Sequence, residues 1–282
     1  MAKRVQDDET ADGLSVDESE TVDDRKAGSP KVVHEVIRLR GEEELDRPVA
    51  SLLFSGFAAG VAISVSLLAQ AFIAMRLPAA PWTPLISGFG YTVGFVIVVL
   101  GNLQLFTEST VTAVLPIATH PTRRNLARLL RLWLIVFAAN MAGTLLVAAL
   151  SAGRVIVSAD QLATMLALSR HALDHDAVTT LLLGMPAGFL VAAIAWILPN
   201  ARGSEYWVVT SITYVIAIGG FSHVVVGSCE AWLAWLTGGM PLASALGDHI
   251  LPALAGNIIG GTGLFAVVAH GQVRDEILPD DD

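Results

Sequence analysis

The sequence predicts an all-α membrane protein with six transmembrane helices, built as two inverted three-helix repeats whose middle helices are broken. Composition is the first observation: of 282 residues, 54% are hydrophobic and 15% charged, and the mean hydropathy is +0.62. These values are too apolar for an ordinary soluble domain. Six apolar runs are long enough to cross a hydrocarbon core about 30 Å thick. The second and fifth runs are interrupted at corresponding places in the two halves of the chain.

The predicted spans lie within one channel domain, residues 48–272, flanked by acidic cytoplasmic tails at 1–47 and 273–282. Residues 1–46 hold 14 acidic and 7 basic residues, so the acidic pI is a property of the tail and carries no information about a substrate. We expect most of this tail to be disordered. Basic and apolar residues at 31–40 predict a short helix at the inner membrane surface or, alternatively, a nascent helix in a flexible tail. The spans are 49–76, 83–116, 132–152, 177–198, 206–236 and 249–270.

Arginine placement predicts a multi-pass protein of the cell's inner (plasma) membrane with both termini in the cytoplasm. Short cytoplasmic loops carry an excess of Lys and Arg over external loops. The predicted inner loops carry Arg123, Arg124, Arg128, Arg131, Arg202 and Arg274, and the outer loops only Arg76, Arg154 and Arg170. An even number of spans agrees with this orientation. Three spans per half is an odd number, so the two halves must cross the membrane in opposite directions.

The interruptions read GNLQLFTEST at 101–110 and GGFSHVVVGS at 219–228, and each precedes a span with an Asn-x-x-Gly pattern. Asn140 and Asn257 are 117 positions apart, and so are Phe106 and His223. Irregular backbone survives at membrane depth only inside protein or beside a water-filled cavity. Paired broken helices in repeated halves are therefore the sequence sign of a transport site near the middle of the bilayer.

His223 in the second break is the main candidate for the centre of this site. Ionisable residues within spans are costly and tend to mark ion or proton pathways, and an imidazole can change charge near neutral pH. The other interpretation is a hydrogen-bonded structural histidine. Glu108 and Glu230 are secondary candidates as proton partners, together with Ser222 beside the histidine. The two glutamates could instead lie at a vestibule mouth or a protomer interface.

Three segments make the chain resemble the formate–nitrite transporters: LFTEST at 105–110, GFSH at 220–223 and GNIIGG at 256–261. The resemblance covers roughly residues 48–272. It implies an aquaporin-like architecture and a homopentamer with one pore in each protomer. It also implies that the partner is a small monovalent anion, or the corresponding weak acid, in a lipid bilayer.

The resemblance further implies roles for particular residues. The substrate pore and proton relay would comprise His223, the loop threonine Thr107 and Asn257 of the last span. Hydrophobic constrictions would lie at Tyr91 and Phe95 on one side and near Ile216 on the other, with Phe106 also in this group. The chain departs from the family pattern at Ser222, Gly227, Gly188 and Ala172, which stand where the family usually has Glu, Asn, Asn and Lys. These departures and the long acidic amino-terminal extension mark a divergent subgroup.

An anion that crosses an apolar constriction faces a large desolvation cost. The hypothesis is that His223 polarises or protonates the anion so that a neutral acid passes, with Thr107 and Asn257 fixing the imidazole and the substrate. Two alternatives stay open: a pore for a small neutral solute, and a membrane scaffold with a non-conducting pore whose acidic tail recruits a partner.

Other functional classes are not expected. Ser222 and Cys229 lie near a histidine, but no nucleophile-elbow motif accompanies them, so an enzyme is not predicted. No cofactor is expected. His171 and His175 have helical i, i+4 spacing, but a solvated loop is the better interpretation than a metal site. The arginines at 123–131 serve the topology rather than nucleic-acid binding.

Overall fold

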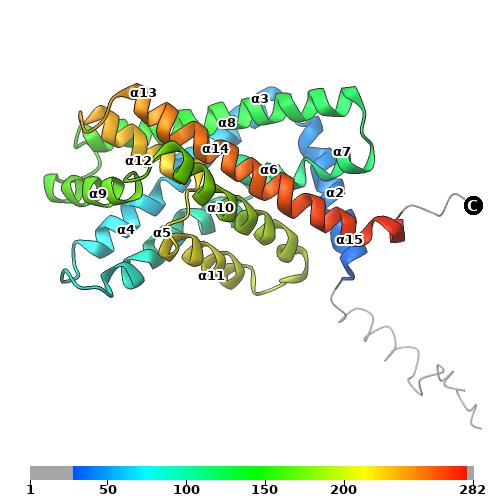
Figure 1. The fold of residues 1–282 in the computed structure, drawn as a ribbon, viewed down its shortest axis with the longest axis horizontal. Coiled ribbons are helices and arrows are strands. Elements are labelled where there is room, and N and C mark those ends of the chain that lie inside the picture. Colours follow the sequence, from blue (N-terminus) through cyan, green and yellow to red (C-terminus); the bar gives the residue numbers. More distant parts are fainter. Residues whose placement is uncertain (1–27, 278–282) are drawn as a thin grey trace, which may run out of the picture.

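The computed structural model describes residues 28–277, which form helices and connecting turns without a strand (Figure 1). The all-α prediction is therefore confirmed for this part of the chain. Most of the predicted amino-terminal tail and the last residues, 1–27 and 278–282, lie outside the described residues.

Five segments are long and apolar enough to cross a membrane. They correspond to the first, second, third, fourth and sixth predicted runs. They are Val49–Ala74, with α3 (Val49–Ile63) and α4 (Val65–Ala74); Thr83–Leu100, which is α5; Arg123–Ala152, which is α8; Ala177–Asn200, with α10 (Ala177–Ile197) and η1 (Leu198–Asn200); and Leu242–Arg274. The last contains α13 (Leu242–Ser244), η2 (Ala245–Ile250), α14 (Leu251–Ile258), η3 (Ile259–Ala266) and most of α15 (Val267–Ile277).

Two helices begin earlier than their apolar runs. α8 starts at Arg123, because the Thr122 side chain accepts a hydrogen bond from Asn125 N and caps a first turn made of charged residues. The last long segment likewise begins at Leu242 rather than 249. One helix of the long connection between α8 and α10 was not predicted: α9 (Ala159–Ala172), which starts with a capping box.

Both predicted breaks are present. α5 ends at Leu100 and α6 (Phe106–Thr112) follows the first break, while α11 (Glu205–Ile218) and α12 (Val224–Leu236) flank the second. Each break opens with a glycine cap followed by a residue of positive φ, Asn102 at 50° and Gly220 at 63°. This left-handed residue ends the helix and sends the chain across the molecule in an extended form. α6, the short helix that follows the first break, is buried along its whole length.

The amino-terminal helix packs on the channel body at the end that carries α15 (Figure 1). This helix, α2 (Pro30–Asp46), contains the range 31–40 and continues beyond it. Val33 and Ile37 are buried in an apolar cluster with residues of α6, α7 (Leu115–Thr119), α10 and η3. His34 Nε2 lies 3.1 Å from Nδ1 of His270, so α2 also contacts the carboxyl-terminal helix.

Glycines allow the two helix pairs α3–α8 and α10–α14 to approach closely. A methyl group at Gly60 would collide with the backbone of Asn140, and one at Gly188 with the backbone of Asn257. Each asparagine is therefore held against a glycine of the preceding straight helix. Small residues at helix contacts are typical of membrane proteins, where lipid provides no hydrophobic drive for association.

We predict that Gly188→Ala destabilises the protein by about 1–3 kcal/mol, because the new methyl group overpacks a backbone contact that cannot move freely. The readout is the thermal unfolding midpoint in detergent. Gly271→Ala is the matched control, since a methyl group there meets nothing within 4 Å. Equal midpoints for the two variants would contradict the close packing described above.

Candidate functional site

Asn140 holds the first break by hydrogen bonds to its backbone. The Asn140 amide Nδ2 donates to the carbonyl oxygens of Gly56, at 2.7 Å, and Gln104, at 3.0 Å. Its Oδ1 accepts from Phe106 N at 2.9 Å, the first residue of α6. The side chain is fully buried and uses both amide protons. One side chain thus satisfies two polar groups that the first break would otherwise leave unpaired, Gln104 O and Phe106 N, and ties them to Gly56 of α3.

Asn257 makes the same three contacts at the second break. Its Nδ2 donates to Gly184 O at 2.9 Å and Ser222 O at 2.8 Å, and its Oδ1 accepts from Val224 N at 2.9 Å. The polar atoms of Asn257 are thus bonded to backbone rather than to the imidazole. The Ser222 carbonyl accepts from Asn257 in the second break, as the Gln104 carbonyl accepts from Asn140 in the first.

The matched contacts correct the predicted register between the two breaks. Val224, not His223, makes the contact that Phe106 makes in the first half, so the breaks are one position further apart than the two asparagines. His223 corresponds instead to Leu105, the residue that precedes α6. The spacing of residues in the sequence could not show this shift, because the shift is defined by the backbone N–H that each asparagine binds.

The His223 ring is held at both nitrogens. It precedes α12 as the N-cap, and its Nδ1 accepts from Val226 N at 3.3 Å. An accepting Nδ1 carries no proton, so the hydrogen-bond pattern assigns the neutral tautomer with the proton on Nε2. Nε2 lies 2.8 Å from Thr107 Oγ1 and therefore donates to it. The Thr107 hydroxyl keeps its own proton available for a further acceptor.

This contact joins the two halves of the protein. Thr107 lies in the first turn of α6, and His223 caps the first turn of α12. Both side chains are almost fully buried, at 0% and 2% exposure. The starts of two helices, with their partly positive N–H groups, therefore face one buried hydrogen bond.

Aromatic side chains form an apolar wall beside the imidazole. The Phe95 ring packs edge-on against His223 with the centroids 4.8 Å apart, and Tyr91 lies 5.4 Å from Phe95. Phe106 differs from the other predicted constriction residues, because its ring packs on α8, against Trp133 at 5.8 Å and against Phe137 of the same helix.

A cavity of about 490 Å³, here called the vestibule, leads to His223. It lies on the side of α9, at the opposite end of the molecule from α2 and α15 (Figure 1). Tyr91 and Ile216 both line it, although the sequence analysis placed them on opposite sides of the histidine. Ser222 and Glu230 line it as well. The structure thus brings five of the ten predicted pore residues to one cavity, whereas Thr107, Asn257, Phe95, Phe106 and Glu108 do not line it.

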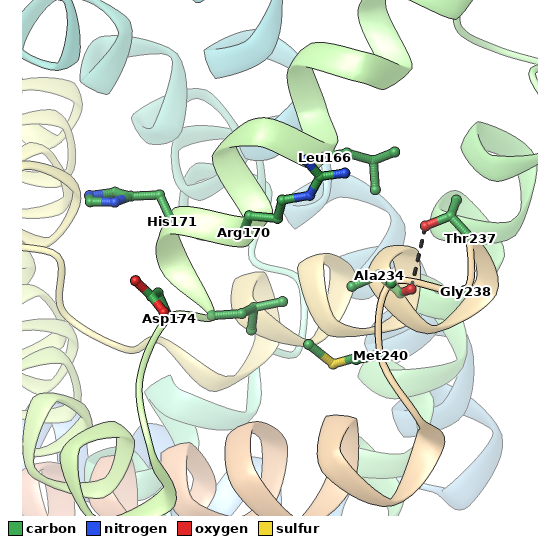
Figure 2. A pocket seen from close by; sticks show the side chains of 10 residues that line it. Leu166, Arg170, His171, Asp174, Ala234, Thr237, Gly238 and Met240 are labelled. Atoms are coloured by element: carbon green, nitrogen blue, oxygen red, sulfur yellow. Dashed lines mark hydrogen bonds between the residues drawn. The ribbon is translucent and has the colours of Figure 1, made fainter.

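A second cavity of about 760 Å³ lies between α9 and the turn after α12. Figure 2 shows Arg170 extending over it from α9, while His171 points to the other side of the helix. Thr237 and Met240 lie across from Arg170. None of the predicted pore residues lines this cavity, so it is not the candidate transport site.

Glu108 lies away from the imidazole and faces α2. Its Oε1 is 2.9 Å from Arg40 Nη2, and Arg40 Nε lies 3.6 Å from Glu44 Oε1. Thr112 Oγ1 donates to the other Glu44 oxygen at 2.8 Å. The sequence analysis missed Arg40 and Glu44. The available signal was Glu108 itself, since a buried carboxylate requires a cationic partner.

Metal binding finds no support in the described part of the chain. No group of three or more His, Cys, Asp or Glu side chains in residues 28–277 is placed to hold a metal ion. α9 ends at Ala172, so His175 lies in the following turn and does not share a helix face with His171.

Comparison with known proteins gives consistent results. The family model for the formate/nitrite transporter matches residues 31–271. The chain is 35% identical over 255 residues to the inner membrane protein YfdC of Escherichia coli K12, covering 90% of this chain and 82% of that protein. It is 25% identical over 242 residues to the formate channel FocA of Haemophilus influenzae, covering 76% and 84%.

Two solved structures have the same fold, each with a TM-score of 0.69. One is a pentameric formate channel with formate bound, at 19% identity, with 80% of this chain and 97% of that one covered. The other is an ion channel of the FNT family, at 15% identity, with 90% and 99% covered.

We predict that Asn257→Ala destabilises the protein by at least about 2 kcal/mol, because it leaves the N–H of Val224 and the carbonyl of Ser222, both in the second break, without this partner. The thermal midpoint in detergent measures the effect. Asn200→Ala is the control, because that amide bonds to Gly28 at the exposed end of α10. A midpoint for Asn257→Ala within error of the control would show that the second break does not depend on this side chain.

Stability should also fall as pH rises through the range in which Glu44 ionises. Burial, and then the neighbouring Glu108, raise the pKa of Glu44 from its ordinary value to about 7. Between roughly pH 4.5 and 7 the folded state therefore binds more protons than the unfolded state, and unfolding becomes easier with rising pH. We expect Glu44→Gln to flatten the curve of thermal midpoint against pH from 5 to 8. An unchanged slope would contradict this role.

Proposed function

Because the chain belongs to the formate/nitrite transporter family, whose members are channels and transporters rather than enzymes, we propose that it conducts small monovalent anions or their weak acids across the inner membrane. The formate-channel relatives support this substrate class. The observation that carries the proposal is the buried hydrogen bond of 2.8 Å between His223 Nε2 and Thr107 Oγ1.

In this mechanism the contact acts as a hydrogen-bond-donating pair. His223 Nε2–H donates to Thr107 Oγ1, which polarises the threonine hydroxyl toward an anion that reaches the imidazole from the vestibule. The Phe95 wall allows no bare charge to pass, because desolvating an ion costs far more than thermal energy. Each pH unit between the pKa of an acid and the ambient pH costs about 1.4 kcal/mol. Passage as the neutral acid is therefore the cheaper route for a weak acid.

The proposed topology has six spans in two inverted repeats, with both termini in the cytoplasm. The five long segments provide five crossings, and α11 with α12 provides the other across the second break. The matched asparagine networks and the matched left-handed residues at the two breaks support the repeat. In this orientation the vestibule opens to the outside and α2 lies at the cytoplasmic end.

We propose a homopentamer with one pore per protomer. The support is the fold shared with a pentameric formate channel. Helices α3, α8 and α11 also expose large apolar side chains that must face lipid or a neighbouring protomer, such as Phe54, Leu134 and Trp207.

A pore for a small neutral solute is the second candidate. The residues of the described chain that line the vestibule include no Lys or Arg, so nothing fixed there attracts an anion by charge. Light scattering by vesicles separates the two: swelling with formate or nitrite supports the first, and swelling with glycerol or urea alone supports the second.

We predict that Thr107→Val reduces formate uptake into proteoliposomes by about tenfold or more, because the only hydroxyl held by the imidazole is lost. Thr107→Ser keeps the hydroxyl and should retain most of the flux. His223→Phe should remove it. Thr164→Val, which loses a hydroxyl on α9 bonded to Asp160 O, is the control for a threonine substitution. Wild-type flux in Thr107→Val would exclude the donating pair.

A further inference from the structure

Glu230 shares the vestibule with His223 and lies on the same face of α12. The two residues are seven positions apart, which is about two helical turns or roughly 10 Å along the axis. The Glu230 carboxyl points back toward the start of α12 and lies over Gly227. A methyl group built on Gly227 would be 4.0 Å from the Glu230 Oε2. Gly227 also lines the vestibule. Because Gly227 has no side chain, the Glu230 carboxyl is open to the vestibule.

This carboxyl has no fixed partner. Glu230 is only 8% exposed, and within residues 28–277 its oxygens make no hydrogen bond or ion pair. The ionisable groups that surround the vestibule are Tyr91 from α5, His249 from η2, and His171 and His175 around the end of α9. Its neighbour Cys229 is directed to Ser64 instead. Glu230 is therefore a buried carboxyl that faces a cavity lined by no Lys or Arg.

The imidazole is poorly suited to supply the proton for an anion. Adding a proton to His223 requires Nδ1, whose lone pair accepts from Val226 N. A charged ring would therefore lose the cap of α12. The Nε2 proton is shared with Thr107 and can be polarised, but releasing it would leave an imidazolate. A protein group that gives a proton to an incoming anion must therefore be another side chain of the same cavity.

We propose that Glu230 is the proton-exchanging and specificity-determining residue of the vestibule, an inference that rests on the proposed function. The protonated carboxyl transfers its proton to the incoming anion, the O–H bond of Glu230 breaks, and a new bond to hydrogen forms on the anion. The neutral acid then moves past His223 and Phe95. The Glu230 carboxylate regains a proton from hydronium in the vestibule water, so each turnover carries one anion and one proton.

Specificity follows from the same chemistry. The protonated Glu230 carboxyl is neutral and can give its proton only to an anion that is basic enough to accept it. An anion that cannot accept the proton stays charged and must cross the Phe95 wall as a bare ion, which desolvation makes far more costly. Weak-acid anions such as formate and nitrite meet the condition, whereas chloride and nitrate do not.

The test separates use of the anion from use of the neutral acid. Uptake of labelled formate is measured with the full-length protein in proteoliposomes at two pH values that differ by one unit. Total formate is tenfold higher at the higher pH, so the concentration of formic acid is the same in both measurements and only that of the anion differs. Wild-type uptake should rise several-fold with the anion. Glu230→Gln cannot transfer a proton, so its uptake should stay constant. Glu230→Asp should recover part of the rise. Glu205→Gln, at the start of α11, should behave as wild type.

The outcomes are distinct. A rise in Glu230→Gln equal to the wild-type rise overturns the role of Glu230 and leaves the proposed function intact. A wild type that takes up formate without any rise at each one-unit step from pH 4 to pH 7 also overturns it, because at the steps where the carboxyl is still protonated uptake through Glu230 would follow the anion. A wild type without uptake of formate or nitrite overturns the proposed function itself. If formate uptake by Glu230→Asp again rises with the anion, the absence of this rise in Glu230→Gln is not caused by a folding defect.

Discussion

The backbone polar groups of two broken helices are the constraint on which the rest of this structure depends. A chain that leaves helical form at membrane depth exposes N–H and C=O groups that lipid cannot satisfy. Asn140 and Asn257 each bind two of these groups and one carbonyl of a straight helix, and each is pressed against a glycine of a neighbouring helix. The short helices α6 and α12 can begin in the middle of the protein because the asparagines meet their first N–H groups.

The chemistry of the site follows from that scaffold. Since α12 must begin where Asn257 places it, the preceding residue becomes its cap, and that residue is His223. Capping occupies Nδ1, which assigns the proton to Nε2 and directs it to Thr107. The tautomer is thus a consequence of backbone architecture. The imidazole becomes a fixed neutral donor, and the ionisable carboxyl of Glu230 lies further out in the same cavity.

Much of this could be predicted from sequence, since apolar length and paired glycine-rich interruptions are local properties. The interruptions predicted at 101–110 and 219–228 follow from such patterns, and the structure confines them to 101–105 and 219–223. His223 is a candidate because of its place in the second break, whereas the roles of Thr107 and Asn257 are expected from the family resemblance. Contacts between distant segments could not be predicted. The bonds of Asn257 to backbone, the ion pair of Arg40 with Glu108, and the packing of Phe106 on α8 depend on which helices become neighbours. The one-position shift of register depends on the choice of hydrogen-bond acceptor.

That shift explains why a repeated scaffold can hold a site that is not repeated. The two halves share their asparagine contacts and left-handed turns, yet the residue before α6 is Leu105 and the residue before α12 is His223. One half therefore provides the imidazole and the other the hydroxyl of Thr107. In the proposed function this asymmetry gives the pore a single donor pair whose two ends differ, and an anion that arrives from the vestibule meets the carboxyl of Glu230 before it meets that pair.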